Sequence, residues 1–170
     1  MYVEKINLGE SEARTIVSGL RNHISIEDFE GKQVVVVCNL KPRKLRGILS
    51  SGMVLCASNE DHSKVELLCP SETVPNGSQV VVEGLDCSEP LKRLNPKKKI
   101  WEQVVVHLRS DGECKATYKT NPLVIIDNTN PVPPSEEGEA DTNAKGTDES
   151  RSFSRSVGVS CETLVDCDLG

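Results

Sequence analysis

Short apolar segments, separated by glycine, proline and asparagine, constrain the fold of this chain most strongly. Residues 2–8 alternate between apolar and polar side chains, as half-buried strands do. Five more segments are rich in valine, leucine and isoleucine: 13–20, 32–40, 52–58, 64–70 and 78–85. No crossover helix of about ten residues lies between them, as parallel βαβ units would require. The spacing therefore predicts a mostly β chain built as a small barrel or sandwich.

Helical signals are few. Residues 25–31 predict a short helix, with Ser25 as N-cap, acidic residues in the first turn and a glycine at the end. Residues 88–108 also favour a helix, because Pro96 suits a first turn and apolar side chains follow at helical spacing: Ile100, Trp101, Val104 and Leu108. Residues 114–126 return to β character. A small α/β region is thus expected to follow the first strands.

Composition and charge divide the chain. Only 3% of its 170 residues are aromatic, so valine, leucine and isoleucine must build the core. Up to residue 126 there are 17 Lys or Arg against 16 Asp or Glu, whereas from residue 127 there are 3 against 10. The second part is also rich in proline, serine and glycine, a composition that favours disorder. Residues 127–170 are therefore predicted to be a disordered acidic tail.

No targeting feature stands out. No segment approaches the ~20 apolar residues of a membrane span, and the first residues show no secretory signal. The seven cysteines are scattered without a CxxC pair, which suits reduced thiols. We expect a cytoplasmic protein with no membrane partner.

Catalytic motifs are also missing from the sequence. It contains neither of the glycine-rich phosphate motifs, and its three histidines have no zinc-ligand spacing. A nucleophile pair of Cys38 and His62 is one alternative, but free cysteine is usually a small buried apolar residue. The sequence thus predicts no enzyme, no cofactor and no metal.

Two clusters of cations remain. The first contains Lys41, Arg43, Lys44 and Arg46; the second contains Lys92, Arg93, Lys97, Lys98 and Lys99. Ordinary solvated loops are one interpretation. Three features favour an anionic ligand instead. Pro42 and Gly47 bracket the first cluster, hydroxyls and glycine follow at residues 50–53, and the second cluster opens a predicted helix, where cations oppose the dipole.

The anion is more plausibly a polynucleotide than a nucleotide, because counterion release rewards several spaced cations. Small OB-fold barrels bind oligonucleotides on a strand face and its loops. Phe29 and Tyr118 are the only aromatic residues near the clusters, and both are interpreted as core. Recognition should therefore rest on the shape and backbone of a structured RNA.

Three stretches carry a resemblance to a known family: RTIVSGLRNHI at 14–24, VVVVCNLKPRKLRGILSSGMVLCAS at 34–58 and LNPKKKIWEQ at 94–103. Over about residues 1–126 the chain resembles the tRNA-binding domain of the endothelial-monocyte-activating-polypeptide type. This domain ends plant-type methionyl-tRNA synthetases, some tyrosyl-tRNA synthetases and the multisynthetase-complex auxiliary protein. The resemblance implies an OB-fold with a pseudo-dimeric C-terminal extension that clasps tRNA without sequence specificity.

Matching positions of the family imply RNA contacts at Asn39, Lys41, Arg46, Ser50 and Met53. Together with the neighbouring cations, the predicted site is Asn39, Lys41, Arg43, Lys44, Arg46, Ser50, Met53, Lys97, Lys98 and Lys99. The basic segment would then act as a phosphate clamp on the rim of the barrel.

The chain departs from the family at both ends. It starts at MYVE, without the strand that opens the OB-fold in the family, so the barrel should have a gap with unpaired edges. After ATYK the family's last segment is replaced by the acidic stretch. The expected domains are an OB-fold core at 1–62, a C-terminal extension at 63–126 and a tail at 127–170.

The function predicted from the sequence is a non-catalytic tRNA-binding module that serves an aminoacyl-tRNA synthetase, methionyl first among them, or the multisynthetase complex. One alternative is a fragment or isoform of methionyl-tRNA synthetase. Another is a cytokine-like protein-interaction module.

Overall fold

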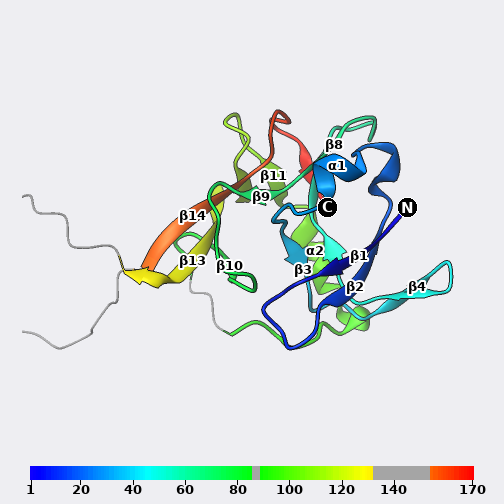
Figure 1. Ribbon diagram of the computed structural model, residues 1–170. Coiled ribbons are helices and arrows are strands. Elements are labelled where there is room, and N and C mark those ends of the chain that lie inside the picture. Colours follow the sequence, from blue (N-terminus) through cyan, green and yellow to red (C-terminus); the bar gives the residue numbers. More distant parts are fainter. Residues whose placement is uncertain (86–88, 132–153) are drawn as a thin grey trace, which may run out of the picture.

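The structure is a computed structural model that describes residues 1–85, 89–131 and 154–170 (Figure 1). Its first strands and helices are β1 (Tyr2–Ile6), β2 (Arg14–Ser18), η1 (Leu20–Asn22), α1 (Ile26–Phe29), β3 (Val36–Val37), β4 (Arg43–Leu45), β5 (Ile48–Ser50), β6 (Met53–Val54) and β7 (Cys56–Ser58). The rest are β8 (Val65–Leu67), β9 (Cys69–Pro70), β10 (Val80–Val82), η2 (Pro96–Lys98), α2 (Ile100–Val105), β11 (Leu108–Ser110), β12 (Ala116–Tyr118), β13 (Asn121–Pro131), β14 (Ser154–Ser160) and β15 (Asp168–Leu169). Within these ranges, no helix is long and apolar enough to cross a bilayer.

The prediction of a mostly β fold with a barrel is confirmed. The largest sheet has nine strands in the order β8-β7-β15-β11-β12-β13-β14-β9, with β10 beside β13. Because only Leu68 separates β8 from β9 in the chain, the two ends of this path meet and the sheet is nearly closed. Smaller two-stranded sheets pair β1 with β2, β3 with β6 and β4 with β5.

Local signals placed the first elements well. The alternation over residues 2–8 produces β1, whose Tyr2, Glu4 and Ile6 are half-buried while the residues between them are exposed. The short helix α1 begins where predicted, since the Ser25 Oγ accepts a hydrogen bond of 3.1 Å from the Asp28 N–H.

The helix predicted within residues 88–108 is shorter and broken. Asn95 caps the 3₁₀ turn η2 by accepting a hydrogen bond of 3.0 Å from the Lys97 N–H. Lys99 then adopts a left-handed conformation, with φ of 48°, before α2 begins at Ile100. Lys97 and Lys98 therefore lie in the last turn of η2 rather than in the first turn of a long helix. The expected conflict with a helix dipole is absent at these residues.

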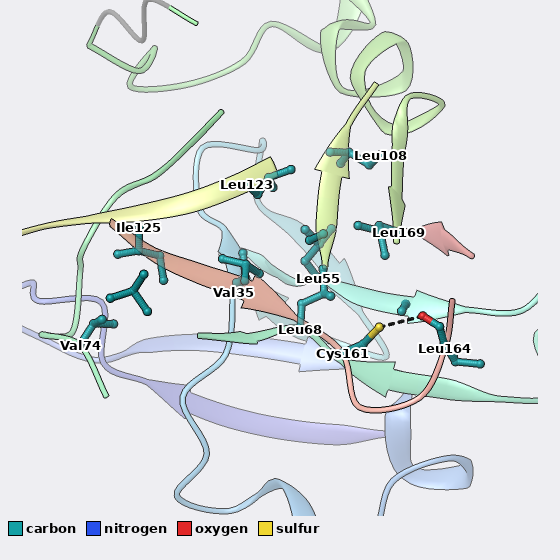
Figure 2. Close-up of a cluster of buried hydrophobic side chains, with 14 residues drawn as sticks. Val35, Leu55, Leu68, Val74, Leu108, Leu123, Ile125, Cys161, Leu164 and Leu169 are labelled. Carbon is teal, nitrogen blue, oxygen red and sulfur yellow. Dashed lines mark hydrogen bonds between the residues drawn. The ribbon is translucent and has the colours of Figure 1, made fainter. Parts of the chain in front are cut away.

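Two clusters of buried side chains hold the fold together. The smaller one lies under β1 and β2 and is built on Ile16, Leu20, Val54 and Cys56. The larger one draws on strands from both ends of the chain, and Figure 2 labels ten of its members, among them Val35, Leu55, Leu123 and Leu169. The predicted division at residues 62 and 126 stays a prediction, although this larger core takes side chains from all three regions.

The prediction of a disordered tail is wrong for residues 127–131, which end β13, and for residues 154–170. Residues 154–160 form β14, which pairs with β13 on one side and with β9 on the other. Residues 168–169 form β15, which lies between β7 and β11. Residues 132–153 lie outside the described part, so the prediction is not tested there.

Apolar side chains explain why this segment folds. Val157, Val159 and Leu169 are at most 4% exposed, and each fully buried valine or leucine contributes about 1.5–3 kcal/mol. Cys161 is also buried, and its thiol donates a hydrogen bond of 3.0 Å to the Leu164 carbonyl (Figure 2). The average composition of residues 127–170 is polar, so these few apolar positions did not predict a folded segment. They are buried only by packing against strands far away in the sequence.

The expected unpaired edge is present. Within the described residues, β1 pairs only with β2, and no strand lies against its other edge.

Candidate nucleic-acid interface

The first basic cluster lies on a β-hairpin and on the residues just before it. β4 and β5 pair antiparallel, with Leu45 opposite Ile48, and only Arg46 and Gly47 remain in the turn. Both turn residues have positive φ, 48° and 86°, which is the type I′ geometry of tight hairpins. In Figure 1 this hairpin projects from the body, on the side opposite the β13–β14 ribbon.

The backbone at the tip of the hairpin is costly for arginine. A side chain with a Cβ in the left-handed region costs about 1–2 kcal/mol, and asparagine is the residue that this first turn position favours. Arg46 occupies it with its side chain exposed. Asparagine would therefore be less strained than arginine at this position.

The cations of this hairpin face solvent. Lys41, Arg43, Lys44 and Arg46 are exposed, and none forms an ion pair with a residue that the structure describes. Because side chains alternate along a strand, Arg43 and Lys44 point to opposite faces of the hairpin. The hairpin therefore presents positive charge on both faces and at its tip.

Arg14 fixes the base of the hairpin, although sequence reasoning did not select it. Its Nη1 donates to the carbonyls of Cys38 and Ser51, at 2.5 Å and 3.1 Å, and so joins the two chain segments that enter and leave the hairpin. Glu10 holds the other side of the guanidinium, with Nε–Oε2 at 2.7 Å. The hydrogen bonding between the two side chains lowers the pKa of Glu10 and raises the pKa of Arg14. A lone arginine at the start of a strand gave no signal of this role.

Asn39 connects the two basic clusters. Its side-chain Nδ2 donates to the Leu91 carbonyl at 3.1 Å, and its backbone carbonyl accepts from the Leu94 N–H at 2.8 Å. These bonds hold the segment that carries Lys92 and Arg93 against the residues just before the hairpin. Asn39 is thus a scaffold that brings together cations about 50 residues apart in sequence.

The other cations of the second cluster extend this surface. Lys97, Lys98 and Lys99 are exposed on η2 and at the start of α2, three residues beyond the segment that Asn39 holds. Like the hairpin cations, they have no acidic partner among the described residues.

Ser50 and Met53 are placed differently from the cations. The Ser50 side chain is 5% exposed, and its Oγ accepts from the Val17 N–H and donates to the Gly52 carbonyl, both at 3.0 Å. Met53 is half-buried on β6, opposite Val37. The Ser50 hydroxyl is therefore engaged inside the fold, and the RNA contacts expected of both residues stay predictions.

The alternative cysteine and histidine pair finds no support in the geometry. Cys38 is exposed and its carbonyl is bound by Arg14, whereas the His62 Nδ1 lies 3.1 Å from the Ser58 Oγ in another hairpin. Among the described residues, no group of histidine, cysteine and carboxylate side chains is arranged to hold a metal.

The two aromatic residues interpreted from the sequence as core, Phe29 and Tyr118, do pack against it. Phe29 packs on Tyr2 with ring centroids 5.8 Å apart, and it joins the smaller core cluster. Tyr118 contacts His107 edge-on at 5.9 Å and packs against the larger cluster. Neither ring is an open platform for base stacking.

Comparison with known families gives one match in the first half of the chain. Residues 1–79 match the family described as "Putative tRNA binding domain". This range includes the hairpin, Arg14 and Asn39.

Curated relatives and a solved structure agree with that match. The chain is 46% identical to the mouse aminoacyl tRNA synthase complex-interacting multifunctional protein 1, over 74% of this chain and 39% of that protein. It is 48% identical to a probable methionine–tRNA ligase of rice, over 72% of this chain and 15% of that protein. It is 46% identical to the cytoplasmic tyrosine–tRNA ligase of zebrafish, over 73% of this chain and 24% of that protein.

The solved C-terminal domain of Plasmodium vivax p43 superposes with a TM-score of 0.74 at 29% identity, covering 99% of this chain and 84% of that one. The chain spans well under half the length of the curated relatives named above.

Proposed function

Because residues 1–79 match the family described as "Putative tRNA binding domain", we propose that the two basic clusters form one surface that grips the phosphate backbone of tRNA. The observation that carries this proposal is the junction at Asn39, which holds the second cluster beside the base of the hairpin. The surface then contains nine exposed cations: Lys41, Arg43, Lys44, Arg46, Lys92, Arg93, Lys97, Lys98 and Lys99.

Binding works by charge and shape. The two-residue turn and Arg14 fix the direction of the hairpin before RNA binds. Binding therefore costs little free energy for ordering the hairpin backbone. Arg43 and Arg46 can each donate two parallel hydrogen bonds to one phosphate, whereas the lysines act as point charges. Without an exposed aromatic platform in the described part of the site, the surface reads the backbone of folded RNA rather than its bases.

We place the chain beside an aminoacyl-tRNA synthetase, as a non-catalytic auxiliary that raises the local concentration of tRNA. Names of the relatives support this role, since they include a synthase complex-interacting protein and two tRNA ligases. Methionyl-tRNA synthetase is the proposed partner, because the rice relative with 48% identity is a methionine–tRNA ligase. The cytoplasm is the proposed compartment, in keeping with the relatives named as cytoplasmic ligases.

Salt-dependent binding of mixed tRNA tests the surface. With about five phosphate contacts, the association constant should fall on the order of a hundredfold or more between about 50 mM and about 200 mM monovalent salt. Filter binding at several salt concentrations measures the slope directly. Equal affinity at the two concentrations, or a strong preference for one anticodon, would contradict the proposal.

A further inference from the structure

The β4–β5 hairpin exposes large apolar side chains beside its cations. Leu45, Ile48 and Leu49 are 38%, 37% and 50% exposed, and none of them belongs to either buried cluster. Single exposed apolar residues are ordinary on a protein surface, whereas a group of them marks a site of interaction. The phosphate contacts proposed above use only the cations, so the function of these three side chains is a separate question.

Leu45 and Ile48 form an apolar pair on one face of the hairpin. They lie directly opposite each other in the register, next to the two-residue turn. Opposite residues of an antiparallel pair have Cβ atoms about 4.5–5.5 Å apart, so the two side chains make one continuous apolar surface. Because side chains alternate along a strand, Leu49 lies on the other face, opposite Lys44. The joined apolar pair is thus a property of one face only.

Two arginines flank this pair. Arg43 shares its face, two residues or about 6–7 Å before Leu45 along the strand, and Arg46 follows Leu45 at the tip. Both arginines are exposed, and neither forms an ion pair with a residue that the structure describes. An apolar surface between two cations is complementary to a ligand with an apolar centre and an anion on each side. A nucleotide within an RNA strand has this form, with a phosphate on either side of its base and ribose.

We propose that Leu45 and Ile48 pack against the base of an unpaired nucleotide in the bound RNA, while Arg43 and Arg46 bind the phosphates beside it. This inference rests on the proposed function and deepens it by naming the part of the RNA that the hairpin contacts. In duplex RNA the bases are stacked on their neighbours, whereas loops, bulges and ends offer unstacked bases.

The chemistry of the pair also decides what it cannot read. Leucine and isoleucine are among the side chains that other proteins insert between the bases of a nucleic acid. Their alkyl groups neither donate nor accept hydrogen bonds, so the contact does not distinguish one base from another. The hairpin therefore selects an unpaired nucleotide by its shape and leaves the sequence of the RNA free.

Two RNAs with equal numbers of phosphates test this preference. One is a stem–loop with 2-aminopurine in its loop, and the other is a blunt duplex. In filter binding at the same salt concentration, the full chain should bind the stem–loop about five- to tenfold more tightly than the duplex. The fluorescence of 2-aminopurine should change on binding, because the loop base moves onto an apolar surface. Equal affinity for the two RNAs, or unchanged fluorescence, would overturn the proposal.

The double variant Leu45→Thr with Ile48→Thr removes the apolar pair and keeps the hairpin, since threonine favours strands and pairs well across them. Its affinity for the stem–loop should fall about five- to tenfold at every salt concentration, with an unchanged slope of log K against log salt, because the phosphate contacts remain. Hydrogen exchange of residues 43–50 checks that the hairpin is intact. Exchanging the pair, as Leu45→Ile with Ile48→Leu, retains the apolar surface and should restore most of the lost affinity.

Leu49→Thr is the matched control on the other face and should change the affinity by less than about twofold. An unchanged affinity in the double variant, or an equal loss in Leu49→Thr, would overturn this inference and leave the phosphate surface in place. Failure of the proposed function would look different, because the native chain would then bind the stem–loop without dependence on salt. Unchanged RNA binding together with lost binding to purified methionyl-tRNA synthetase would overturn the inference in favour of a protein-docking pair.

Discussion

The β4–β5 hairpin and the C-terminal segment, residues 154–170, obtain their conformations in opposite ways. The hairpin folds locally, through a two-residue turn, and exposes its charges. The C-terminal segment gains its conformation only by joining strands that lie far away in the chain, and it hides Val159 and Leu169 almost completely. One region should therefore tolerate substitutions that change binding, whereas the other should respond through stability.

The largest expected effect is the loss of stability in Leu169→Ala. Leu169 is 1% exposed at the join between β7 and β11, so shortening it leaves a cavity in the larger core. The free energy of unfolding of the variant, measured by urea denaturation, should be lower than that of the native chain by about 2–5 kcal/mol. Val165→Ala is the matched control, since Val165 lies in the same segment and is 44% exposed. This substitution should change the free energy of unfolding by less than about 0.5 kcal/mol. Equal effects of the two would show that the segment does not share the core.

Glu66 should contribute the next largest effect, because it anchors the same segment. Its Oε2 accepts hydrogen bonds from the backbone N–H groups of Glu162, Thr163 and Leu164, at 3.1, 2.8 and 3.2 Å. Burial alone would raise the pKa of Glu66, but the bonds from Thr163 and its neighbours outweigh this and lower it below 4.5. We expect Glu66→Gln to reduce the free energy of unfolding by about 1–3 kcal/mol near neutral pH.

The pH dependence gives this prediction a second test. A carboxyl whose pKa is lower in the folded state stabilises the fold above its unfolded pKa, about 4.3–4.5, and the contribution is lost as pH falls through the folded value. The difference between the native chain and Glu66→Gln should thus shrink in urea denaturation below about pH 4.5. A difference that stays constant down to this range would mean that the ionised carboxylate is not the anchor.

Arg46→Asn should separate binding from stability. Asparagine before glycine is favoured in a type I′ turn, so the melting temperature should stay the same or rise slightly. Affinity for tRNA should fall about five- to tenfold, because one charge-assisted contact is lost. Lys119→Asn is a matched control, since Lys119 is exposed, has φ of 59° and lies outside both basic clusters. Similar losses of affinity in both variants would show that only net charge matters.

The smallest effect is expected for Lys92→Ala. Lys92 lies in the segment that Asn39 holds, but an ammonium makes a single point contact where arginine makes two parallel bonds. We expect a loss of affinity of about two- to threefold in filter binding, with unchanged stability. A loss as large as that of Arg46→Asn would show that a guanidinium at the hairpin tip contributes no more to binding than a single lysine of the surface.

The sequence by itself determined the elements that depend on interactions between neighbouring residues. Alternation placed β1 and the hydroxyl of Ser25 capped α1, because each of these features depends on residues a few positions apart. The run of cations marked a charged segment but did not predict the hairpin that carries it. The resemblance of three stretches to a family also predicted the fold, which the structure confirms, and the class of ligand, which stays a proposal.

Tertiary structure alone decided the rest. It recruited residues 154–170 into the core, since their apolar side chains are buried only against β7, β9, β11 and β13. It also engaged Asn39 and Ser50 in hydrogen bonds within the fold, and gave Arg14 its place at the base of the hairpin. Each of these roles needs a partner at least 24 residues away, so no pattern of neighbouring residues could reveal it.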